Sequence, residues 1–407
     1  MSETPPREAA PPSLAALSLI AVIFINMLGF GIIVPLLQFY GQSFNAAPWQ
    51  IALVFSAFSA GSFFGEPFWG RLSDRYGRKP ILISTLCCTC LCYFALAFAP
   101  NVWAALAIRF LGGMFSGNGS VVQGYIADVT PPEGRTRTMS YMGSAWNIGL
   151  IVGPSVGGVF AKPGVGPIGF QIPMFIAAGL AATAALAILL FIRESRGRST
   201  ERQPSRWEAT GEAVRHPVIG RLMLLTFLVG FAFTGIEGTF SLWSEAKFHW
   251  GPKEVGLCFA FIGITAAFTQ TFVTGPLAER YGQGRMLAVG MGLTLVGQLL
   301  QPLSTHAAMV IALMCVTAIG QSVAWPNVSA LVSETAPADR QGQFLGLNNA
   351  TGALARVAGP FCASLAFTHI SIDGPFYLGA IIVAPSIWLA VMAARRAAAW
   401  RIARVAQ

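Results

Sequence analysis

Three ionisable residues, Arg109, Glu237 and Arg356, interrupt long apolar stretches of the sequence. A charge held away from water is costly, and proteins keep one there mostly for function. A carboxyl group in such a place can take up and release a proton, and a guanidinium can neutralise it or bind an anion. The three residues therefore indicate proton exchange, anion binding or a purely structural ion pair.

A second concentration of charge lies in residues 70–80, which read G-R-L-S-D-R-Y-G-R-K-P. Residues 275–285 read G-P-L-A-E-R-Y-G-Q-G-R and repeat a Gly, a Leu, an acid and Arg-Tyr-Gly in the same register. Glycine at such positions permits a tight turn. The charged side chains of the first segment are Arg71, Asp74, Arg75, Arg78 and Lys79.

The elements that carry these residues are predicted to be membrane-spanning helices. The 407-residue chain is 54% hydrophobic and 11% charged, with a mean hydropathy of +0.62, which lies outside the range of soluble domains. A bilayer core about 30 Å thick needs roughly 20 apolar residues of helix to cross it. The expected fold class is an all-α polytopic membrane protein. About twelve spans are predicted, at 14–40, 49–70, 80–99, 102–126, 138–161, 171–193, 219–246, 254–275, 285–304, 308–332, 343–367 and 375–397.

The positive charges predict how the spans are oriented. Most of the 26 Lys and Arg residues fall on the side that holds both ends of the chain, so both termini are expected in the cytoplasm of a bacterial cell, with the spans in its inner membrane. Arg109, Glu237 and Arg356 then lie in the outer halves of spans four, seven and eleven. The net charge of +9 is mainly an orientation signal, and we expect no nucleic-acid partner.

The chain divides into two similar halves. The polar segment 194–217 separates a six-helix bundle at 14–193 from a second one at 218–397, with a leader at 1–13 and a tail at 398–407, both expected to be cytoplasmic. The charged segment recurs at an offset of 205 residues, and Gly153-Pro154 recurs as Gly359-Pro360. Because each half has an even number of spans, we expect a parallel repeat about an axis along the membrane normal.

These features together resemble the major facilitator superfamily, and in detail its twelve-helix drug/proton antiporter branch, which includes tetracycline exporters. The resemblance covers nearly the whole chain after the leader. Its motifs are G-x-L-x-D-R-x-G-R-K in residues 70–79, G-x-G-x-x-x-P at Gly29, Gly31 and Pro35, R-x-x-x-G-x-x-x-G at Arg109, Gly113 and Gly117, and G-x-x-x-G-P-x-x-G-G at Gly149, Gly153, Pro154, Gly157 and Gly158.

The resemblance implies that the charged segment is a cytoplasmic gate. In that family the Asp contacts the start of the eleventh helix, here 339–343, and the last Arg pairs with an acid that ends the fourth. The simpler alternative is that Arg71, Arg75 and Lys79 only bind anionic lipid headgroups. Glu66 is either solvated or part of this gate. The predicted gating residues are Gly70, Asp74, Arg75, Gly77, Arg78, Asp128, Glu279 and Arg280.

Glycines four residues apart form a smooth helix face that allows close packing. The branch associates this motif with antiport, and simple close packing explains it equally well. The helix-packing residues are Gly149, Gly153, Pro154, Gly157, Gly158, Gly359 and Pro360.

Span one departs from the branch, because Asn26 stands where many of these antiporters carry an Asp, and Asn cannot titrate. The branch's proton site therefore does not carry over, and Glu237 is the best remaining acid for proton coupling, with Arg109 and Arg356 as neighbouring charges. The candidate cavity residues are Asn26, Gln38, Asn118, Gln123, Trp243, Gln321, Trp325 and Asn327.

The sequence thus predicts a monomeric secondary transporter that exports a small amphipathic or apolar compound in exchange for protons. One alternative is a facilitator or carrier of a lipid or anionic metabolite that uses Arg109 and Arg356. Another is a membrane sensor that moves nothing. No enzyme activity, metal or cofactor is expected, because no metal-ligand pair, P-loop or triad is present.

Overall fold

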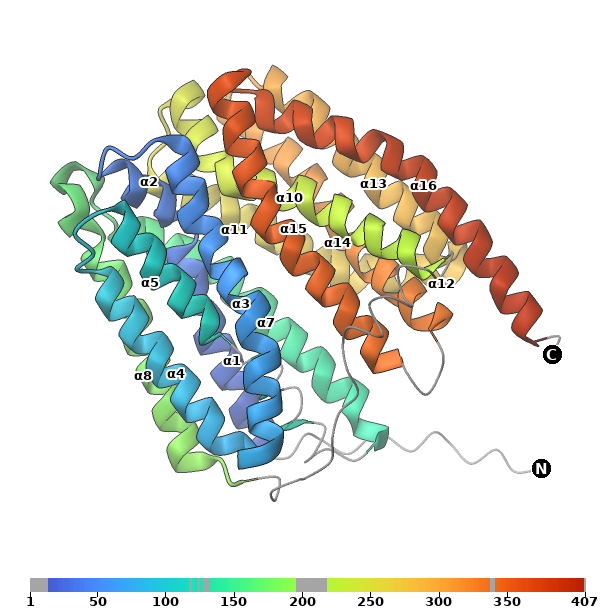
Figure 1. Cartoon of the computed structure of the whole chain (residues 1–407). Helices are drawn as coiled ribbons and strands as arrows, with labels where there is room; N and C mark the ends of the chain where they lie inside the picture. The colour runs from blue at the N-terminus through green and yellow to red at the C-terminus, as the bar shows by residue number, and fades with distance from the viewer. Residues whose placement is uncertain are drawn as a thin grey trace.

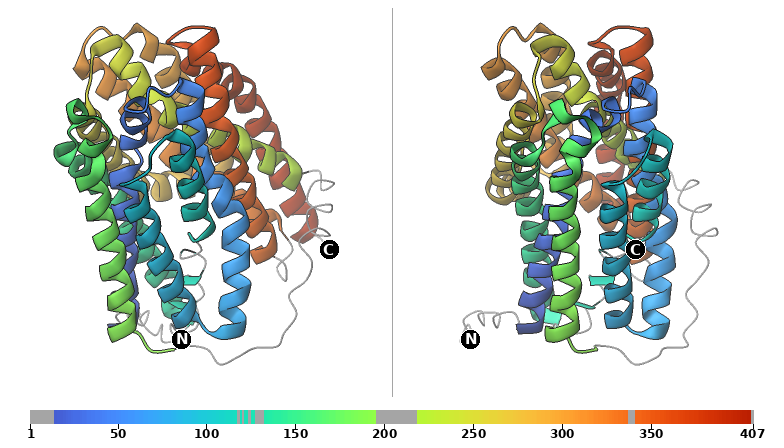
Figure 2. Two further views of the ribbon diagram at one scale, coloured as in Figure 1. Left: turned by 60° about the vertical axis from the view of Figure 1, so that its left-hand side comes forward. Right: turned by 90° about the vertical axis from the view of Figure 1, so that its left-hand side faces the viewer.

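The structure is a computed structural model that describes residues 14–116, 119, 121–122, 125–126, 132–194, 218–336 and 341–405. This part of the chain contains helices and turns and no strand. Figure 1 shows the first half, coloured blue to green, beside the second half, coloured yellow to red. From two further sides, the long helices of both halves run roughly in one direction (Figure 2).

The first half begins with a broken span. Helices α1 and α2 are separated at Val34 and Pro35, because proline has no N–H to continue the hydrogen-bond ladder. The elements are α1 (Leu14–Ile33), α2 (Leu36–Gln42), α3 (Pro48–Tyr76), α4 (Arg78–Leu96), α5 (Val102–Met114), α7 (Pro132–Phe160), the 3₁₀ segment η1 (Pro163–Phe170) and α8 (Gln171–Phe191).

The second half contains an unusual eighth span, in which the π-helical segment η2 joins α11 to α12. Its elements are α10 (Ile219–Phe248), α11 (Pro252–Phe268), η2 (Thr269–Thr274), α12 (Gly275–Tyr281), α13 (Gln283–Leu300), the short 3₁₀ turn η3 (Gln301–Leu303), α14 (Ala307–Thr335), α15 (Gln341–His369) and α16 (Gly374–Val405).

The predicted order of spans is confirmed. Ten stretches of the described chain are long and apolar enough to cross a membrane, and two shorter apolar helices, Val102–Met114 and Ile148–Phe160, stand where spans four and five are predicted. Helix α5 ends at Met114, earlier than the predicted span 102–126, of which the residues beyond 116 are described only in part. Segment 195–217 lies outside the described residues.

The hydrophobic core is organised differently at the two ends of the molecule. We call the end with the turns 43–47 and 249–251 the outer end and the end with Gly77 the inner end, following the predicted orientation. At the outer end one cluster of buried residues draws on both halves, for example Phe39 and Tyr40 with Phe240 and Trp243. At the inner end each half has its own cluster, one from α10, α13, α14, α15 and α16 and one from spans one, three, four, five and six. Contacts of α3 with α15 and of α7 with α11 join the halves, which diverge toward the bottom of Figure 1.

Candidate functional site

The outer end is held by a side-chain amide that bonds to the backbone of the opposite half. Gln38 of α2 is only 2% exposed. Its Nε2 donates to the carbonyl oxygen of Gly238, and its Oε1 accepts from the N–H of Leu242 at 3.0 Å. In an α-helix these two backbone groups, four residues apart, normally bond to each other. Gln38 therefore joins the halves by bonding to both backbone groups of one position in the α10 ladder.

Two further contacts extend this closure. One turn beyond Gln38, the amide of Gln42 donates to the Glu245 carboxylate of α10. On the other side of the interface α7 and α11 approach backbone to backbone: a Cβ added at Gly158 would lie 2.5 Å from the Pro252 carbonyl oxygen, and one added at Gly256 would lie 2.6 Å from that of Pro154. The closure therefore depends on glycine and on uncharged donors.

The predicted packing glycines of α7 lie against α1 within the first half. A Cβ at Gly149 would be 2.8 Å from the Met27 Cβ, one at Gly153 2.7 Å from the Gly31 Cα, and one at Gly157 2.5 Å from the Ile32 carbonyl oxygen. In the second half, a Cβ at Gly359 would be 2.6 Å from the Phe231 carbonyl oxygen of α10, and Pro360 lies beside Gly238. Of the α7 motif, Gly158 and the carbonyl of Pro154 face the other half.

The charged turn at the inner end is bonded within the first half. Arg78 forms a 2.8 Å salt bridge with Asp74 and donates to the Ser73 hydroxyl at 2.7 Å. The Glu194 carboxylate, which follows α8, accepts from the N–H groups of Arg78 and Lys79 at 2.8 and 3.1 Å. It thus satisfies two of the unpaired donors that begin α4.

Two predicted gate contacts lie outside the described residues. Asp128 and residues 339–340 are not described, nor are the side chains of 341–343. The contacts of Asp74 with the start of span eleven and of Arg78 with Asp128 therefore stay predictions.

The two copies of the charged turn, at Gly77 and Gly282, have similar backbone conformations but different surroundings. Gly77 has φ 102° and ψ 156°, and Gly282 has φ 85° and ψ 143°. The guanidinium of Arg75 lies over the ring of Tyr76, and that of Arg280 lies over Tyr281, each 5.4 Å from the centroid. Gly77 is packed against Glu194, whereas nothing would lie within 4 Å of a Cβ at Gly282. Glu279 and Arg280 are exposed, and so is Gly275, the counterpart of Gly70.

Arg109 is buried in the first half at 3% exposure. Its guanidinium lies 4.5 Å from the centroid of the Phe58 ring, in a cation–π contact. Within the described chain its Nε has no hydrogen-bond partner. Because a desolvated guanidinium carries five N–H donors, this one retains the capacity to bind an acceptor.

Glu237 and Arg356 are neighbours in the second half, on α10 and α15. They interact electrostatically, but among the described salt bridges none joins them directly. Arg356 also interacts with Glu66 of α3, from the other half. Its guanidinium lies beside Trp325 and Gly352, since a Cβ at Gly352 would be 3.7 Å from the Arg356 Nη1 and 2.9 Å from the Trp325 ring. Arg356 is thus within electrostatic range of a carboxylate from each half.

The other candidate cavity residues are dispersed. Gln38 belongs to the outer closure, and Trp243 is fully buried there with its indole N–H donating to Asp373 at 2.7 Å. Asn327 donates to the Val323 carbonyl of its own helix at 2.7 Å, and the Gln321 Nε2 has no partner in the described chain. Asn118 and Gln123 lie outside the described residues.

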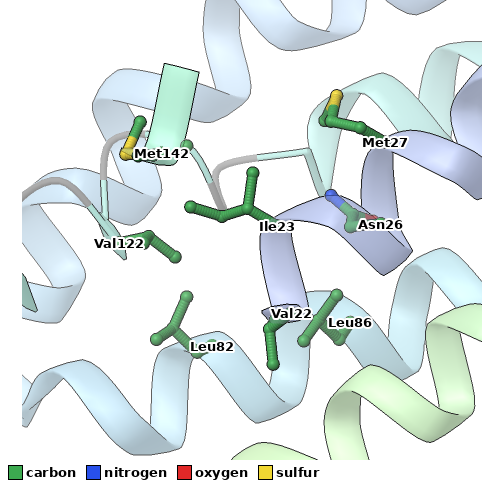
Figure 3. Close-up of a pocket in the computed structure, with 9 residues that line it drawn as sticks. Val22, Ile23, Asn26, Met27, Leu82, Leu86, Val122 and Met142 are labelled. Atoms are coloured by element: carbon green, nitrogen blue, oxygen red, sulfur yellow. The ribbon is translucent and has the colours of Figure 1, made fainter. Parts of the chain in front are cut away.

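Asn26 lines a small cavity in the first half, shown in Figure 3. The volume is about 20 Å³, room for about one water and too little for a drug-sized ligand. Asn26 contributes the one polar side chain among the lining residues, which are Val22, Ile23, Asn26, Met27, Leu82, Leu86, Gly119, Val122 and Met142.

Proteins of similar sequence include drug-resistance proteins of bacteria. Tetracycline resistance protein, class H, of Pasteurella multocida is 28% identical, and the match covers 90% of this chain and 94% of that protein. Tetracycline resistance protein, class C, of Escherichia coli is 27% identical over 95% and 97% of the two chains. Multidrug resistance protein 2 of Bacillus subtilis is 26% identical over 92% and 94%.

Solved structures share the fold over nearly the whole chain. The human organic anion transporter MFSD10 superposes with a TM-score of 0.71 at 22% identity, covering 94% of this chain and all of that one. A bacterial homologue of the human lysosomal transporter Spinster, in an inward-facing unoccupied conformation, gives 0.71 at 16% identity over 95% of each chain. The Major Facilitator Superfamily pattern matches residues 19–273 and 222–407. The chain therefore belongs to the Major Facilitator Superfamily and is a transporter of that family.

Proposed function

We propose that this transporter exports a small amphipathic or apolar organic compound in exchange for protons, by alternating access. The observation that carries the proposal is the core shared by both halves at the outer end, set against the separate cores at the inner end. Such an arrangement is what an inward-open carrier needs in order to accept a substrate from the cytoplasm or inner leaflet. The tetracycline and multidrug resistance proteins of similar sequence support export as the direction, because removal of a drug from the cell protects it.

Proton coupling in this proposal centres on Glu237. Span one has Asn26 and no acid, so another group must titrate, and Glu237 is a half-buried carboxylate beside Arg356. A proton that neutralises Glu237 weakens its attraction for Arg356. Arg356 also interacts with Glu66 of the first half. Once Glu237 is neutral, the attraction of Arg356 to Glu66 therefore dominates and draws the guanidinium toward the interface between the halves. A coupling of 1 to 3 kcal/mol, about 5- to 150-fold, between proton and substrate occupancy is enough for antiport.

The test uses Glu237→Gln in proteoliposomes with an internal pH dye. A substrate is first chosen by thermal-shift screening of tetracyclines, quinolones and organic anions, because a bound ligand raises the melting temperature. We expect the variant to lose transport driven by a pH gradient and to retain substrate exchange at zero gradient. Asn26→Ala is the matched control and should keep coupling. A Glu237→Gln variant with the wild-type ratio of protons to substrate would exclude Glu237 as the coupling group.

A second candidate function is the carriage of an organic anion. It is favoured by the Nε of buried Arg109, which has no hydrogen-bond partner among the described residues and which a carboxylate or phosphate would satisfy. The experiment compares binding of an anionic compound with its methyl ester in wild type and in Arg109→Gln. Anion carriage predicts that the ester binds at least tenfold more weakly to wild type and that the difference vanishes in the variant. Equal binding of acid and ester would exclude it.

A further inference from the structure

A cavity of about 340 Å³ opens at the outer end, beyond the Gln38 contact. Its size falls within the range of small-molecule sites, about 300–1,000 Å³. Its walls come from α2, α3, α10 and α15 and from the turn before α3, so both halves contribute. The lining residues are Gln42, Ala46, Pro48, Ile51, Leu242, Glu245, Ala246 and Phe367.

The walls are apolar except for one carboxylate and one amide. Glu245 is half-buried and accepts a hydrogen bond from the Gln42 amide, which occupies one of roughly four lone-pair positions on an ionised carboxylate. In the described chain no Lys, Arg or His forms a salt bridge with it. The nearby Lys247 bonds instead to the Pro302 carbonyl and to Asp373. The cavity therefore contains a carboxylate that forms no salt bridge with a cation of the described chain.

We propose that this cavity is a binding site for a small organic ammonium ion with an apolar body, reached from the outer side. The positive nitrogen lies against the Glu245 carboxylate, because a partly desolvated charge is stabilised by an opposite one. The apolar body contacts Ile51, Leu242 and Phe367, which gives the site its preference for organic cations over metal ions.

Occupancy of this site holds the outer end shut. The walls come from both halves, so the cavity keeps its shape only while those halves are together, and a ligand stabilises the state to which it binds. An organic ammonium ion added outside therefore acts as an inhibitor, whatever the transported substrate. Binding itself does not depend on the proposed export, so the two ideas can fail separately.

The test measures binding of benzyltrimethylammonium to the purified protein by isothermal titration calorimetry, in dodecyl maltoside, whose headgroup is uncharged. Phenylacetate tests the need for positive charge, and tetramethylammonium tests the apolar walls. We expect benzyltrimethylammonium to bind, tetramethylammonium to bind at least fivefold more weakly and phenylacetate not to bind.

Two variants locate the site. Glu245→Gln should weaken the binding of benzyltrimethylammonium at least tenfold. Glu254→Gln, which changes an exposed acid in the first turn of α11, should leave the binding unchanged. Ala246→Phe keeps the carboxylate and fills the cavity, so it should also weaken binding. This variant replaces Glu245→Gln as the test if Glu245→Gln does not fold. Equal weakening by the two acid variants, unchanged binding in Ala246→Phe, or no binding to wild type overturns the proposal.

Discussion

The two ends of this transporter are held by different chemistry. At the outer end, an amide bonded to helix backbone and a glycine-to-backbone contact join opposite halves. At the inner end, the described charged contacts of Asp74, Arg78 and Glu194 lie within the first half. Neutral contacts depend on shape and are little affected by salt, whereas ion pairs depend on charge and are screened by salt where water reaches them. The outer contacts therefore depend on how well the two halves fit together, and the described inner charges hold a turn within the first half.

Of the variants that test this difference between the two ends, Asp74→Asn is expected to have the largest effect on transport. The change removes the charge that binds Arg78 and that the proposed inner gate requires, so most transport should be lost while expression and ligand binding persist. Spin-label distances between the inner ends of α3 and α15 should show a larger inward-open population. Glu279→Gln, the equivalent acid in the exposed second turn, is the matched control. If both variants transport at the same rate, the two charged turns are equivalent in function, and the proposed special role of the first turn is wrong.

The outer closure is tested by Gln38→Leu. The variant loses two hydrogen bonds between the halves, while Gly238 and Leu242 can bond to each other within α10. Losing about 1.4 kcal/mol in net hydrogen bonding shifts the population about tenfold toward outward-open. Distances between labels at the outer ends of α2 and α10 measure this shift. Gln42→Leu removes a less buried contact and should shift the population less. A larger shift in Gln42→Leu would mean that the contact of Gln42 with Glu245, and not that of Gln38, is the main one holding the outer end closed.

The smallest expected effect separates the two glycine turns. Alanine at Gly77 or Gly282 must adopt a positive φ with an extended ψ, a region used almost exclusively by glycine, at a cost of about 1–3 kcal/mol. At Gly77 the added Cβ would also lie 2.5 Å from the Glu194 Oε2, so the carboxylate must leave the start of α4. Thermal unfolding in detergent should therefore show a greater loss for Gly77→Ala than for Gly282→Ala. The same loss in both would mean that Glu194 contributes nothing measurable.

The fold could be predicted from sequence because hydropathy is a local property. Spans such as 49–70 and 80–99 are recognisable from one apolar run each, and the Arg-Tyr-Gly repeat aligns the halves. The early end of α5 was not predicted, since Phe115 and Ser116 are compatible with a longer helix. There the Ser116 hydroxyl bonds to the Gly113 carbonyl at 2.7 Å, an alternative to continuing the ladder.

The site could be predicted only in part. Arg109, Glu237 and Arg356 stand out because charge is rare in apolar runs. Gln38 was recognised as a polar residue in a span, but its partners are backbone groups 200 and 204 positions away, and backbone groups carry no sequence signal because every residue has them. The interaction of Arg356 with Glu66 depends on how α3 crosses α15, which no pattern within either helix specifies.

The π-helical segment η2 explains how the repeat survives a difference in length. Pro48 begins α3 22 residues before Gly70, and Pro252 begins α11 23 residues before Gly275. In a continuous α-helix one inserted residue would turn everything after it by about 100°. A wide turn with i→i+5 hydrogen bonds accommodates the extra residue instead, and the Thr274 hydroxyl bonds across it to the Thr269 carbonyl at 3.1 Å. Helix α12 thus stays in phase with the inner part of α3, and deletion of one residue from η2 should yield a plain α-helix without turning Glu279 to a new face.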